Sequence, residues 1–496
     1  MSSVVNPTHR LYTSRQCREL DRIAMEEFGF SGLALMKTAG LRAFSRITRQ
    51  FGYREPFVVL CGSGNNGGDG YVVARCARET GLEVVVVPAF APGTRDTIRT
   101  CQEYLDLGGR VAPQGNEEVL GDAGIIVDGL FGTGLSRAPA GASARLIETA
   151  NQLHCPVVAL DVPSGLDSDT GAVFSPCIQA DMTVTFIGKK LGLYTGAGTE
   201  RCGPVCFEDL DVPIGVHDRL SAVGRVMSPP RLPGRRVDSH KRDYGSVVVA
   251  GGDDGMLGAV LLCGQAALRC GSGLVTILST RKHLDLSATY CPELMSRCLE
   301  NGSALDASLD RCDVVVLGPG LGLGQWSESV FERVRSLGLP MVIDADGLNI
   351  LSRSGMKNEN QILTPHPGEA ARLLHCPTRE VQDDRVGAAR EITKQYGGVC
   401  ILKGAGTLVV DGAGEVTVCD RGNPGMASAG MGDVLSGMVG ALVGQGMPLP
   451  DAARAGVWLH SSCADRATEN LGQASLLASD IVQILPRMLV RYSRER

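Results

Sequence analysis

Aromatic side chains are scarce in this sequence, long apolar runs are missing, and basic residues are not in excess. Phe, Trp and Tyr make up 4% of the chain, whereas glycine occurs 64 times, a balance typical of α/β proteins with many tight strand-to-helix turns. No apolar run approaches the roughly 18 residues of a membrane-spanning helix, so we expect no membrane partner. The net charge of −6 comes without a basic cluster, so we expect no nucleic-acid partner.

The sequence also lacks any Cys-x-x-Cys pair, although it has 17 cysteines. Cys202 and Cys206 come nearest, without a second pair or histidine partners, which argues against a zinc site. Buried free thiols in a reducing cytoplasm explain the cysteines better, so a cytoplasmic location is expected. Residues 1–16 contain no apolar stretch of the kind a secretory signal has, and we expect a short disordered lead-in there.

Two successive α/β patterns divide the 496 residues. In each, short apolar runs alternate with helical segments, which predicts a parallel sheet covered on both faces. The runs lie at 57–62, 82–90, 124–132, 156–165 and 182–188 in the first pattern, and at 244–252, 273–280, 313–320, 340–348, 361–369 and 399–412 in the second. Residues 221–240 are rich in Pro and Arg and have no apolar period. We therefore predict a domain at 1–222, a linker at 223–235 and a domain at 236–496.

A glycine-rich loop, "CGSGNNGGDG", follows the first apolar run. Gly62, Gly64 and Gly67 satisfy G-x-G-x-x-G, the fingerprint of a dinucleotide-binding turn. A hydride-transfer domain also needs an acidic residue at the end of its second strand, to hold the ribose hydroxyls. Here that strand ends in Pro88 and Ala89, so the sequence argues against a dehydrogenase. No Gly-Lys-Ser/Thr follows, which excludes a P-loop.

The same loop offers two asparagines and an aspartate at a strand end and a helix start. Backbone N–H groups there can hold phosphate, and the side-chain oxygens suit hydroxyls or a hard cation. A plain helix cap is the alternative. Two further strand ends carry Asp128 in "VDGLFGTGLSR" and Asp161 with Ser164 in "LDVPSGLDSDTG". Because ligands of open α/β sheets bind at strand carboxyl ends, three polar loops at this edge predict a site.

These stretches, with "TVTFIGKKLGLYTGAG", closely resemble the NAD(P)H-hydrate epimerase domain over about residues 10–220. The resemblance implies a Rossmann-like three-layer αβα fold. It implies that the hydrated dinucleotide is held by Asn65, Asn66, Gly67, Gly68, Asp69, Gly132, Thr133, Gly134, Leu135, Ser136, Arg137, Ala138 and Asp161. It also implies a potassium ion coordinated by Asn66, Asp128 and Ser164, which would position the phosphates or ribose.

Asp161 and Lys190 are the catalytic residues that the resemblance implies. Hydration of the nicotinamide ring at carbon six gives R and S hydrates, and inverting that centre needs proton transfer and stabilisation of a ring-opened or iminium-like intermediate. A carboxylate in a partly closed pocket can do both. Lys190 keeps the family's spacing to Gly192, although Lys189 stays an alternative. A solvated surface lysine is the other interpretation of Lys190.

The second half carries its own glycine-rich stretch, "GNPGMASAGMGDVLSG". Asp433 follows Gly430 and Gly432 at the start of a mostly apolar helix. Such a helix start can bind a transferring phosphoryl group, and an adjacent aspartate can act as base toward a hydroxyl. Plain complementation of the helix dipole is the alternative. Asp344 and Asp346 in "IDAD" are predicted to share one strand face and to hold Mg²⁺-bound phosphate, or else to cap turns.

This stretch, with "KRDYGSVVVAGG", "GPGLG", "TPHPGE" and "KGAGT", resembles the ribokinase-like NAD(P)H-hydrate dehydratase over about residues 235–490. The resemblance implies a ribokinase-like αβα fold. It implies contacts with the hydrate from Ala259, Gly320, His366 and Asp433. It implies nucleotide contacts from Lys403, Gly404, Ala405, Gly406, Thr407, Asn423, Gly425, Met426, Ala427, Ser428, Ala429, Gly430 and Gly432, with Asp433 as the catalytic base.

A bifunctional repair enzyme follows from the two resemblances. The first domain would interconvert the R and S hydrates of NADH and NADPH, and the second would dehydrate the S form while converting ADP, with Mg²⁺, to AMP and phosphate. Phosphorylation before elimination explains the nucleotide, because phosphate leaves more readily than hydroxide. The fusion order favours ADP over ATP, and a homo-oligomer is expected. A ribokinase-type small-molecule kinase with a non-catalytic N-terminal domain, and a scaffold protein without chemistry, remain alternatives.

Overall fold

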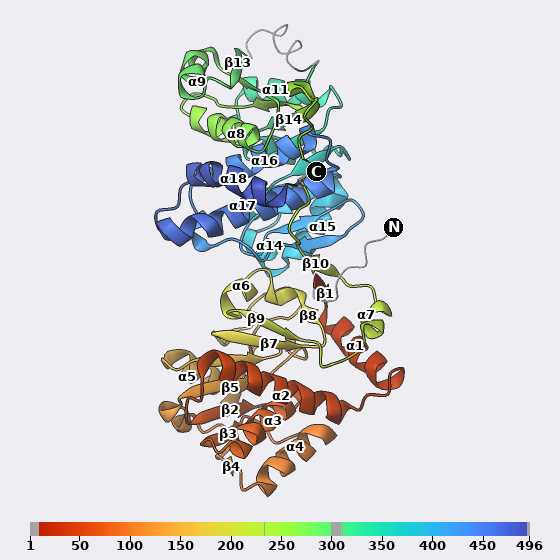
Figure 1. Ribbon diagram of the computed structural model, residues 1–496, viewed down its shortest axis with the longest axis vertical. Helices are drawn as coiled ribbons and strands as arrows, with labels where there is room; N and C mark the ends of the chain where they lie inside the picture. Colours follow the sequence, from red (N-terminus) through yellow and green to blue (C-terminus); the bar gives the residue numbers. More distant parts are fainter. Residues whose placement is uncertain (1–8, 233, 299–308, 310, 494–496) are drawn as a thin grey trace. The chain divides into compact units, whose positions relative to one another are not determined.

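The computed structural model describes residues 9–232, 234–298, 309 and 311–493, which form two compact units, Met1–Arg225 and Val226–Arg496 (Figure 1). The division falls inside the predicted linker, whose first residues form strand β10 (Gly224–Val226). The predicted lead-in is wrong from residue 9 onward, because Arg10–Tyr12 form β1 and helix α1 begins at Ser14. Residues 1–8 of that prediction, and residue 233 of the linker, lie outside the described residues.

Unit 1 is built on a parallel sheet with the strand order β4-β3-β2-β5-β6-β7-β9. Its strands are β2 (Phe57–Cys61), β3 (Val84–Pro88), β4 (Arg110–Val111), β5 (Ile125–Gly129), β6 (Val157–Leu160), β7 (Met182–Phe186) and β9 (Val205–Glu208). The apolar runs predicted as strands are buried here; helices connect β2 to β3, β3 to β4 and β5 to β6, whereas residues 161–181 connect β6 to β7 without a helix. The predicted parallel sheet is therefore confirmed.

Helices cover this sheet on both faces, as Figure 1 shows. They are α1 (Ser14–Glu26), α2 (Gly32–Phe51), α3 (Asn65–Glu79), α4 (Arg95–Asp106), α5 (Ala142–Gln152), α6 (Gly198–Arg201) and α7 (Ile214–Asp218). Alternate residues of β2 serve different layers: Val59 packs in the apolar cluster with α1 to α3, whereas Val58 and Leu60 pack in the cluster with α5. The αβα layering follows from this alternation.

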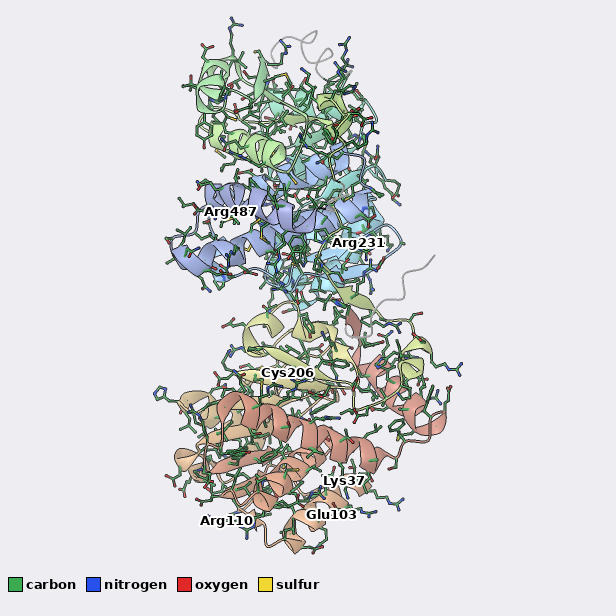
Figure 2. All side chains as sticks on the ribbon, in the orientation of Figure 1. Lys37, Glu103, Arg110, Cys206, Arg231 and Arg487 are labelled. Atoms are coloured by element: carbon green, nitrogen blue, oxygen red, sulfur yellow. The ribbon has the colours of Figure 1, made fainter. Side chains whose placement is uncertain are left out.

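Charged side chains tie the helices of one layer together at the surface. Lys37 of α2 and Arg75 of α3 both bind Glu103 of α4, at 2.8 Å and 3.0 Å (Figure 2). Beside the sheet, β1 pairs in parallel with β8 (Lys189–Lys190) and antiparallel with β10. This pairing draws the N-terminal residues of the unit to the segment that carries Lys190.

Unit 2 has the strand order β13-β12-β11-β14-β15-β16-β17-β18-β19. Its strands are β11 (Ser246–Ala250), β12 (Leu274–Ser279), β13 (Met295–Cys298), β14 (Val314–Leu317), β15 (Met341–Ile343), β16 (Gln361–Leu363), β17 (Val399–Leu402), β18 (Leu408–Val410) and β19 (Val416–Val418). The strands are parallel up to β17, and the pairs β17–β18 and β18–β19 are antiparallel. This arrangement confirms the predicted second α/β sheet.

One helix lies deepest in unit 2. The helices of this unit are α8 (Leu257–Arg269), α9 (Leu284–Tyr290), α11 (Gln325–Arg335), α12 (Asp346–Ser354), α13 (Pro367–Leu374), α14 (Thr378–Asp383), α15 (Arg385–Tyr396), α16 (Met431–Gly444), α17 (Leu449–Leu471) and α18 (Ala478–Tyr492). Helix α16 packs against α8, α17 and the sheet in one apolar cluster. Gly437 allows the close approach to α8, because a Cβ there would lie 2.1 Å from the Cys263 carbonyl oxygen. Among the described residues, no helix is both long and apolar enough to cross a membrane.

Candidate active sites

The glycine-rich loop of unit 1 connects β2 to α3 and lies against the end of β5. A Cβ on Gly62 would stand 1.8 Å from the Leu130 carbonyl oxygen, and one on Gly67 would stand 2.1 Å from that of Gly62. Only glycine tolerates this approach of backbone to backbone. Gly64 is the N-cap of α3, so the predicted contacts from Asn65 to Asp69 occupy its first turns; the N–H groups of Asn65 to Gly67 precede the first intrahelical bond, from Gly68 N–H to the Gly64 carbonyl, and can bind an anion.

The three predicted potassium ligands lie close together at this edge. Asp128 is fully buried at the end of β5 and accepts hydrogen bonds from the hydroxyl of Ser164 at 2.7 Å and from its backbone N–H at 2.8 Å. Burial raises the pKa of Asp128 to about 6. Both polar atoms of the Asn66 side chain are buried without a hydrogen-bond partner in the described chain. A carboxylate, a hydroxyl and an open amide oxygen are the donors a hard cation prefers, so these residues fit potassium.

Asp161 and Lys190 form a buried ion pair. Lys190 is 1% exposed, and its ammonium contacts Asp161 Oδ1 and also donates to Thr185 Oγ1 at 3.1 Å and to the Phe186 carbonyl at 2.8 Å. Burial opposes the charge of Lys190, but the Asp161 carboxylate outweighs it and raises the pKa of the lysine. The surface-lysine interpretation is therefore wrong. Lys189 instead lies over the ring of Tyr194.

The second carboxylate oxygen of Asp161 faces the predicted substrate loops. A Cβ on Gly132 would lie 3.3 Å from Asp161 Oδ2 and 3.5 Å from Asn66 Cβ, so the structure brings these three residues together. Asp161 has φ +64°, a left-handed backbone that is costly outside glycine and that turns the side chain at the end of β6. The rest of the predicted loop is more open: Gly134, Ser136, Arg137 and Ala138 are exposed, with Thr133 and Leu135 half-buried.

The predicted anion site of unit 2 forms at the start of α16. Gly430, with φ +88°, is the N-cap, and a Cβ on Gly432 would lie 3.2 Å from Lys403 Nζ and 3.5 Å from Asp344 Oδ2. Asp433 stands in the first turn, half-buried. Burial raises the pKa of Asp433 to about 7; the Asp344 charge adds to the rise and Lys403 opposes it. A carboxyl group with this pKa can hold or release a proton near neutral pH.

Lys403 joins the carboxylates of this site. Its ammonium contacts Asp344 Oδ1 at 2.8 Å and Glu369 Oε2 at 3.7 Å, and the Ser436 hydroxyl donates to Asp344 Oδ2 at 2.8 Å. Burial would raise the pKa of Asp344, but Lys403 and the hydrogen bonds hold it below its usual value. Asp344 is thus a bound, ionised partner of the lysine.

The predicted sharing of one strand face by Asp344 and Asp346 is wrong. Strand β15 ends at Ile343, and Asp346 is the first residue of α12. Its carboxylate accepts from the Gly322 N–H at 2.8 Å, so it fastens a turn while Asp344 binds Lys403. The alternation of two acidic residues in a sequence predicts a common face only if the strand continues through both.

The remaining predicted contacts of unit 2 surround the start of α16. His366 is half-exposed and caps α13 by accepting from the Gly368 N–H at 3.0 Å, while its own N–H donates to Glu369. Ala259 lies beside Gly320, where a Cβ would be 3.3 Å away. The loop Lys403–Gly404–Ala405–Gly406–Thr407 follows β17, and Asn423, Gly425, Met426, Ala427, Ser428 and Ala429 lead to Gly430.

Comparison with known proteins matches both halves of the chain to family profiles. A family profile described as "YjeF-related protein N-terminus" matches residues 32–192, and one described as "NAD(P)H-hydrate dehydratase" matches residues 247–487. A protein from Coxiella burnetii named bifunctional NAD(P)H-hydrate repair enzyme Nnr is 42% identical over 491 residues, which cover 97% of this chain and 99% of the relative. The protein of that name from Escherichia coli is 40% identical, with 98% and 95% covered.

The chain belongs to the bifunctional NAD(P)H-hydrate repair enzyme family. The predicted pairing of an epimerase with a dehydratase is thereby confirmed. Among solved structures, a ribokinase-like superfamily protein from Enterococcus faecalis is 28% identical with a TM-score of 0.50, covering 53% of this chain and 93% of that protein. This likeness confirms the ribokinase-like αβα class predicted for the second domain.

Four residues of this repair enzyme family member stand close to the predicted sites and escaped the sequence interpretation. Burial raises the pKa of Asp21 on α1 to about 6, and the charges of Lys190 and Asp161 act on it from the unit 1 site. Glu369 links His366 to Lys403, although only its motif was quoted. Neither residue stands out locally, since each is an acidic residue in an ordinary helix.

Arg385 and His460 are the other two. Arg385 is 1% exposed and donates to the carbonyls of Leu402 at 3.3 Å and Lys403 at 3.2 Å, at the start of the predicted nucleotide loop. His460 of α17 hydrogen-bonds to the Met431 backbone, and burial lowers its pKa to about 4. Both act across elements far apart in the sequence, so no spacing could have revealed them.

Proposed function

We propose that the strand ends of unit 1 form the epimerase site and that the start of α16 forms the dehydratase site. The observation that supports this assignment is common to both units: a buried lysine–aspartate pair beside a glycine-rich helix start. The helix start suits the phosphates of a dinucleotide or nucleotide, and the charged pair suits proton transfer next to them. On this proposal, residues 1–222 carry epimerisation, residues 236–496 carry dehydration, and residues 223–235 connect them.

In the epimerase site, the hydrate would bind along Asn65–Asp69 and Gly132–Ala138. The Lys190 ammonium contacts Asp161 Oδ1, and Asp161 would take the proton of the ring hydroxyl. Asn66, Asp128 and Ser164 would hold potassium, which would supply a fixed positive charge near the phosphates or ribose. The open amide of Asn66 supports this set, because a buried amide without partners is costly.

In the dehydratase site, Asp433 would accept the proton of the hydroxyl that attacks the terminal phosphoryl group of ADP, with release of AMP. The ammonium of Lys403 beside Gly432 would offset the charge that develops on the transferred group. Loss of phosphate and of a ring proton then regenerates the dihydronicotinamide. Since Asp344 and Glu369 are engaged with Lys403, we propose that Mg²⁺ arrives on the phosphates of ADP.

The nucleotide would lie between the loops Lys403–Thr407 and Asn423–Gly430. Arg385 supports the start of the first loop by donating to the carbonyls of Leu402 and Lys403. In the second loop, Asn423 donates to Asp465 Oδ1 at 3.0 Å and accepts from the Gly425 N–H at 3.1 Å, and Ser428 donates to the Leu476 carbonyl at 3.2 Å. These contacts pre-form the loop that would close over the phosphates.

We further propose a cytoplasmic homo-oligomer that acts on small molecules, without nucleic-acid or membrane partners. All 17 cysteines of the chain lie in the described residues and carry free thiols, which is compatible with a reducing compartment. Light scattering on the purified full chain tests the oligomer, and a monomeric mass contradicts it.

One assay tests the two activities and the donor together. Full-length protein is given a mixed R and S hydrate of NADH with Mg²⁺, K⁺ and either ADP or ATP, and reduced-nicotinamide absorbance is followed. We expect full recovery with ADP, faster than the hydrates exchange by themselves. Recovery that stops when the S form is consumed would contradict epimerisation by unit 1. No recovery with either nucleotide would favour the small-molecule kinase alternative.

A further inference from the structure

One face of α1 is turned toward the proposed epimerase site. Cys17, Arg18 and Asp21 share this face, because residues three and four apart are neighbours on a helix. The Cys17 thiol contacts the Gly188 carbonyl at 3.8 Å, just before Lys190, and the Arg18 guanidinium contacts the Thr133 carbonyl at 3.4 Å. This face therefore spans from the lysine of the site to the loop proposed to bind the hydrate.

The opposite face of α1 carries acidic residues in ion pairs that are typical of a protein surface. Glu19 and Glu26 are exposed and are both ion-paired with Arg22. Asp21 is adjacent to Arg22 in sequence, yet no hydrogen bond or ion pair holds its carboxyl group within the described residues. Its position is maintained by the helix, whose N-cap Thr13 forms a capping box with Gln16.

Three carboxyl groups and one ammonium share this pocket. Asp21 of α1, Asp69 of α3 and Asp161 after β6 lie near Lys190 of β8, with the Cys17 thiol beside them. Of these three carboxyl groups, Asp161 is the one that contacts Lys190 directly within the described residues, whereas the charge of Lys190 acts on Asp21 and Asp69 without a direct bond. Asp69 is buried, whereas Asp21 is partly exposed and can exchange a proton.

We propose that Asp21 is the second acid–base group of the epimerase site and gives a proton to the hydrate while the Lys190-bound Asp161 takes one. This inference rests on the proposed placement of that site. A pocket with one ionised and one protonated carboxyl group can act as base and acid in the same step. Burial raises the pKa of Asp21 to about 6, which agrees with a group that is partly protonated near neutral pH.

The proton balance of the reaction needs both groups. Asp161 takes the proton of the C6 hydroxyl, the O–H electron pair forms the C6 carbonyl, and the C6–N1 bond breaks. The electrons of that bond take the proton of Asp21 onto N1. Rotation about C5–C6 presents the other face of the aldehyde, and the reverse steps close the ring. Each proton then returns to its donor, so no co-reactant is consumed.

The test uses full-length protein and the purified R hydrate of NADH, without ADP, so that only epimerisation is measured by chiral separation. For Asp21→Asn we expect kcat to fall by about 100-fold or more, with KM changed by less than about threefold. In the wild type, the rate should fall as pH rises above the pKa of the acid. This alkaline limb should be absent from the residual activity of Asp21→Asn and present in Asp21→Glu, which should recover part of the rate.

Three comparisons keep the result interpretable. Glu19→Gln on the outer face should behave as wild type, and every variant should show wild-type hydrogen exchange in residues 9–225, which reports on the folding of unit 1. A wild-type rate in Asp21→Asn, or an alkaline limb that persists in it, would overturn the inference. If Asp161→Asn also kept full epimerase activity, the placement of the site itself would be wrong.

Discussion

In both units a lysine lies among three carboxyl groups, but the carboxylate that it contacts directly has a different proposed role in each. Each surrounds one buried lysine with three carboxyl groups at the carboxyl edge of a parallel sheet. In unit 1 the lysine binds Asp161, the proposed base itself, whereas in unit 2 Lys403 binds Asp344 and leaves the proposed base Asp433 without a direct ion pair. Burial raises the pKa of Asp433 to about 7, and the charge of Asp344 adds to the rise.

The reactions explain this difference. An epimerase must return each proton to where it came from, so an ionised base and a protonated partner suit it. A phosphoryl transfer needs a base strong enough to receive the hydroxyl proton as the new bond forms, and a raised pKa gives that strength. Similar residue sets thus serve different chemistry according to which carboxylate the lysine contacts.

The largest effect should come from removing each base in turn. Asp433→Asn should lower the dehydratase kcat by about 1,000-fold or more and leave epimerisation unchanged. Asp161→Asn should do the reverse. Separate assays of R-to-S conversion without nucleotide, and of S-hydrate dehydration with ADP, measure both. Loss of both activities in either variant would mean that the sites are not independent.

Replacing Lys190 should damage stability as well as activity. Lys190→Met leaves the Asp161 carboxylate without its buried counter-ion, which should cost about 3–5 kcal/mol of unfolding free energy in unit 1. The neighbouring Lys189→Met loses contacts with the rings of Tyr194 and Phe207, and a smaller loss of about 1 kcal/mol is expected. Urea unfolding followed by hydrogen exchange in residues 9–225 distinguishes the two. Equal losses would argue against a buried pair.

The pH profile of the dehydratase should report Asp433. Because the ionised form acts as base, kcat/KM should fall about tenfold per pH unit below the pKa of about 7. The charge of Glu369 raises that pKa, so Glu369→Gln should shift the acid limb to lower pH. The exposed Glu332→Gln serves as control. An acid limb that stays in place would show that Glu369 does not act on the base.

The smallest effect is expected at Gly432. A methyl group there would stand 3.2 Å from Lys403 Nζ, and the flexible lysine can give way. Gly432→Ala should therefore raise the KM for ADP by about tenfold, with little change in unfolding free energy. Gly324→Ala, where nothing lies within 4 Å, is the matched control. An unchanged KM would argue against nucleotide binding at this helix start.

The local sequence pattern predicted the residues at strand ends. It did not predict contacts between segments that are far apart in the sequence. Asp128 and Asp161 could be placed because each follows a buried run. The strand at Arg10–Tyr12 could not, since its partners are residues 189–190 and 224–225. Asp344 and Asp346 were assigned one face because a sequence does not show that β15 stops at Ile343.

The missed site residues share this cause. Asp21 lies near the proposed epimerase site only because α1 packs beside the turn at Gly188, and Arg385 supports a loop that begins 18 positions later in the chain. Tertiary packing decides both, and neither lies in a motif. The family resemblance implied binding roles for the glycine-rich loops because each loop is one contiguous stretch of sequence.

The close contact between Gly437 and Cys263 bears on which of the two activities is lost first when substitutions accumulate. Asp433 lies one turn before that contact on α16, the most deeply packed helix of unit 2. Asp161, in contrast, lies on a loop at the edge of its sheet. Substitutions in the core of unit 2 should therefore displace the carboxyl group of Asp433 before they unfold the chain. Variants that accumulate substitutions in the core of unit 2 should lose dehydration first. They should then only interconvert the R and S hydrates.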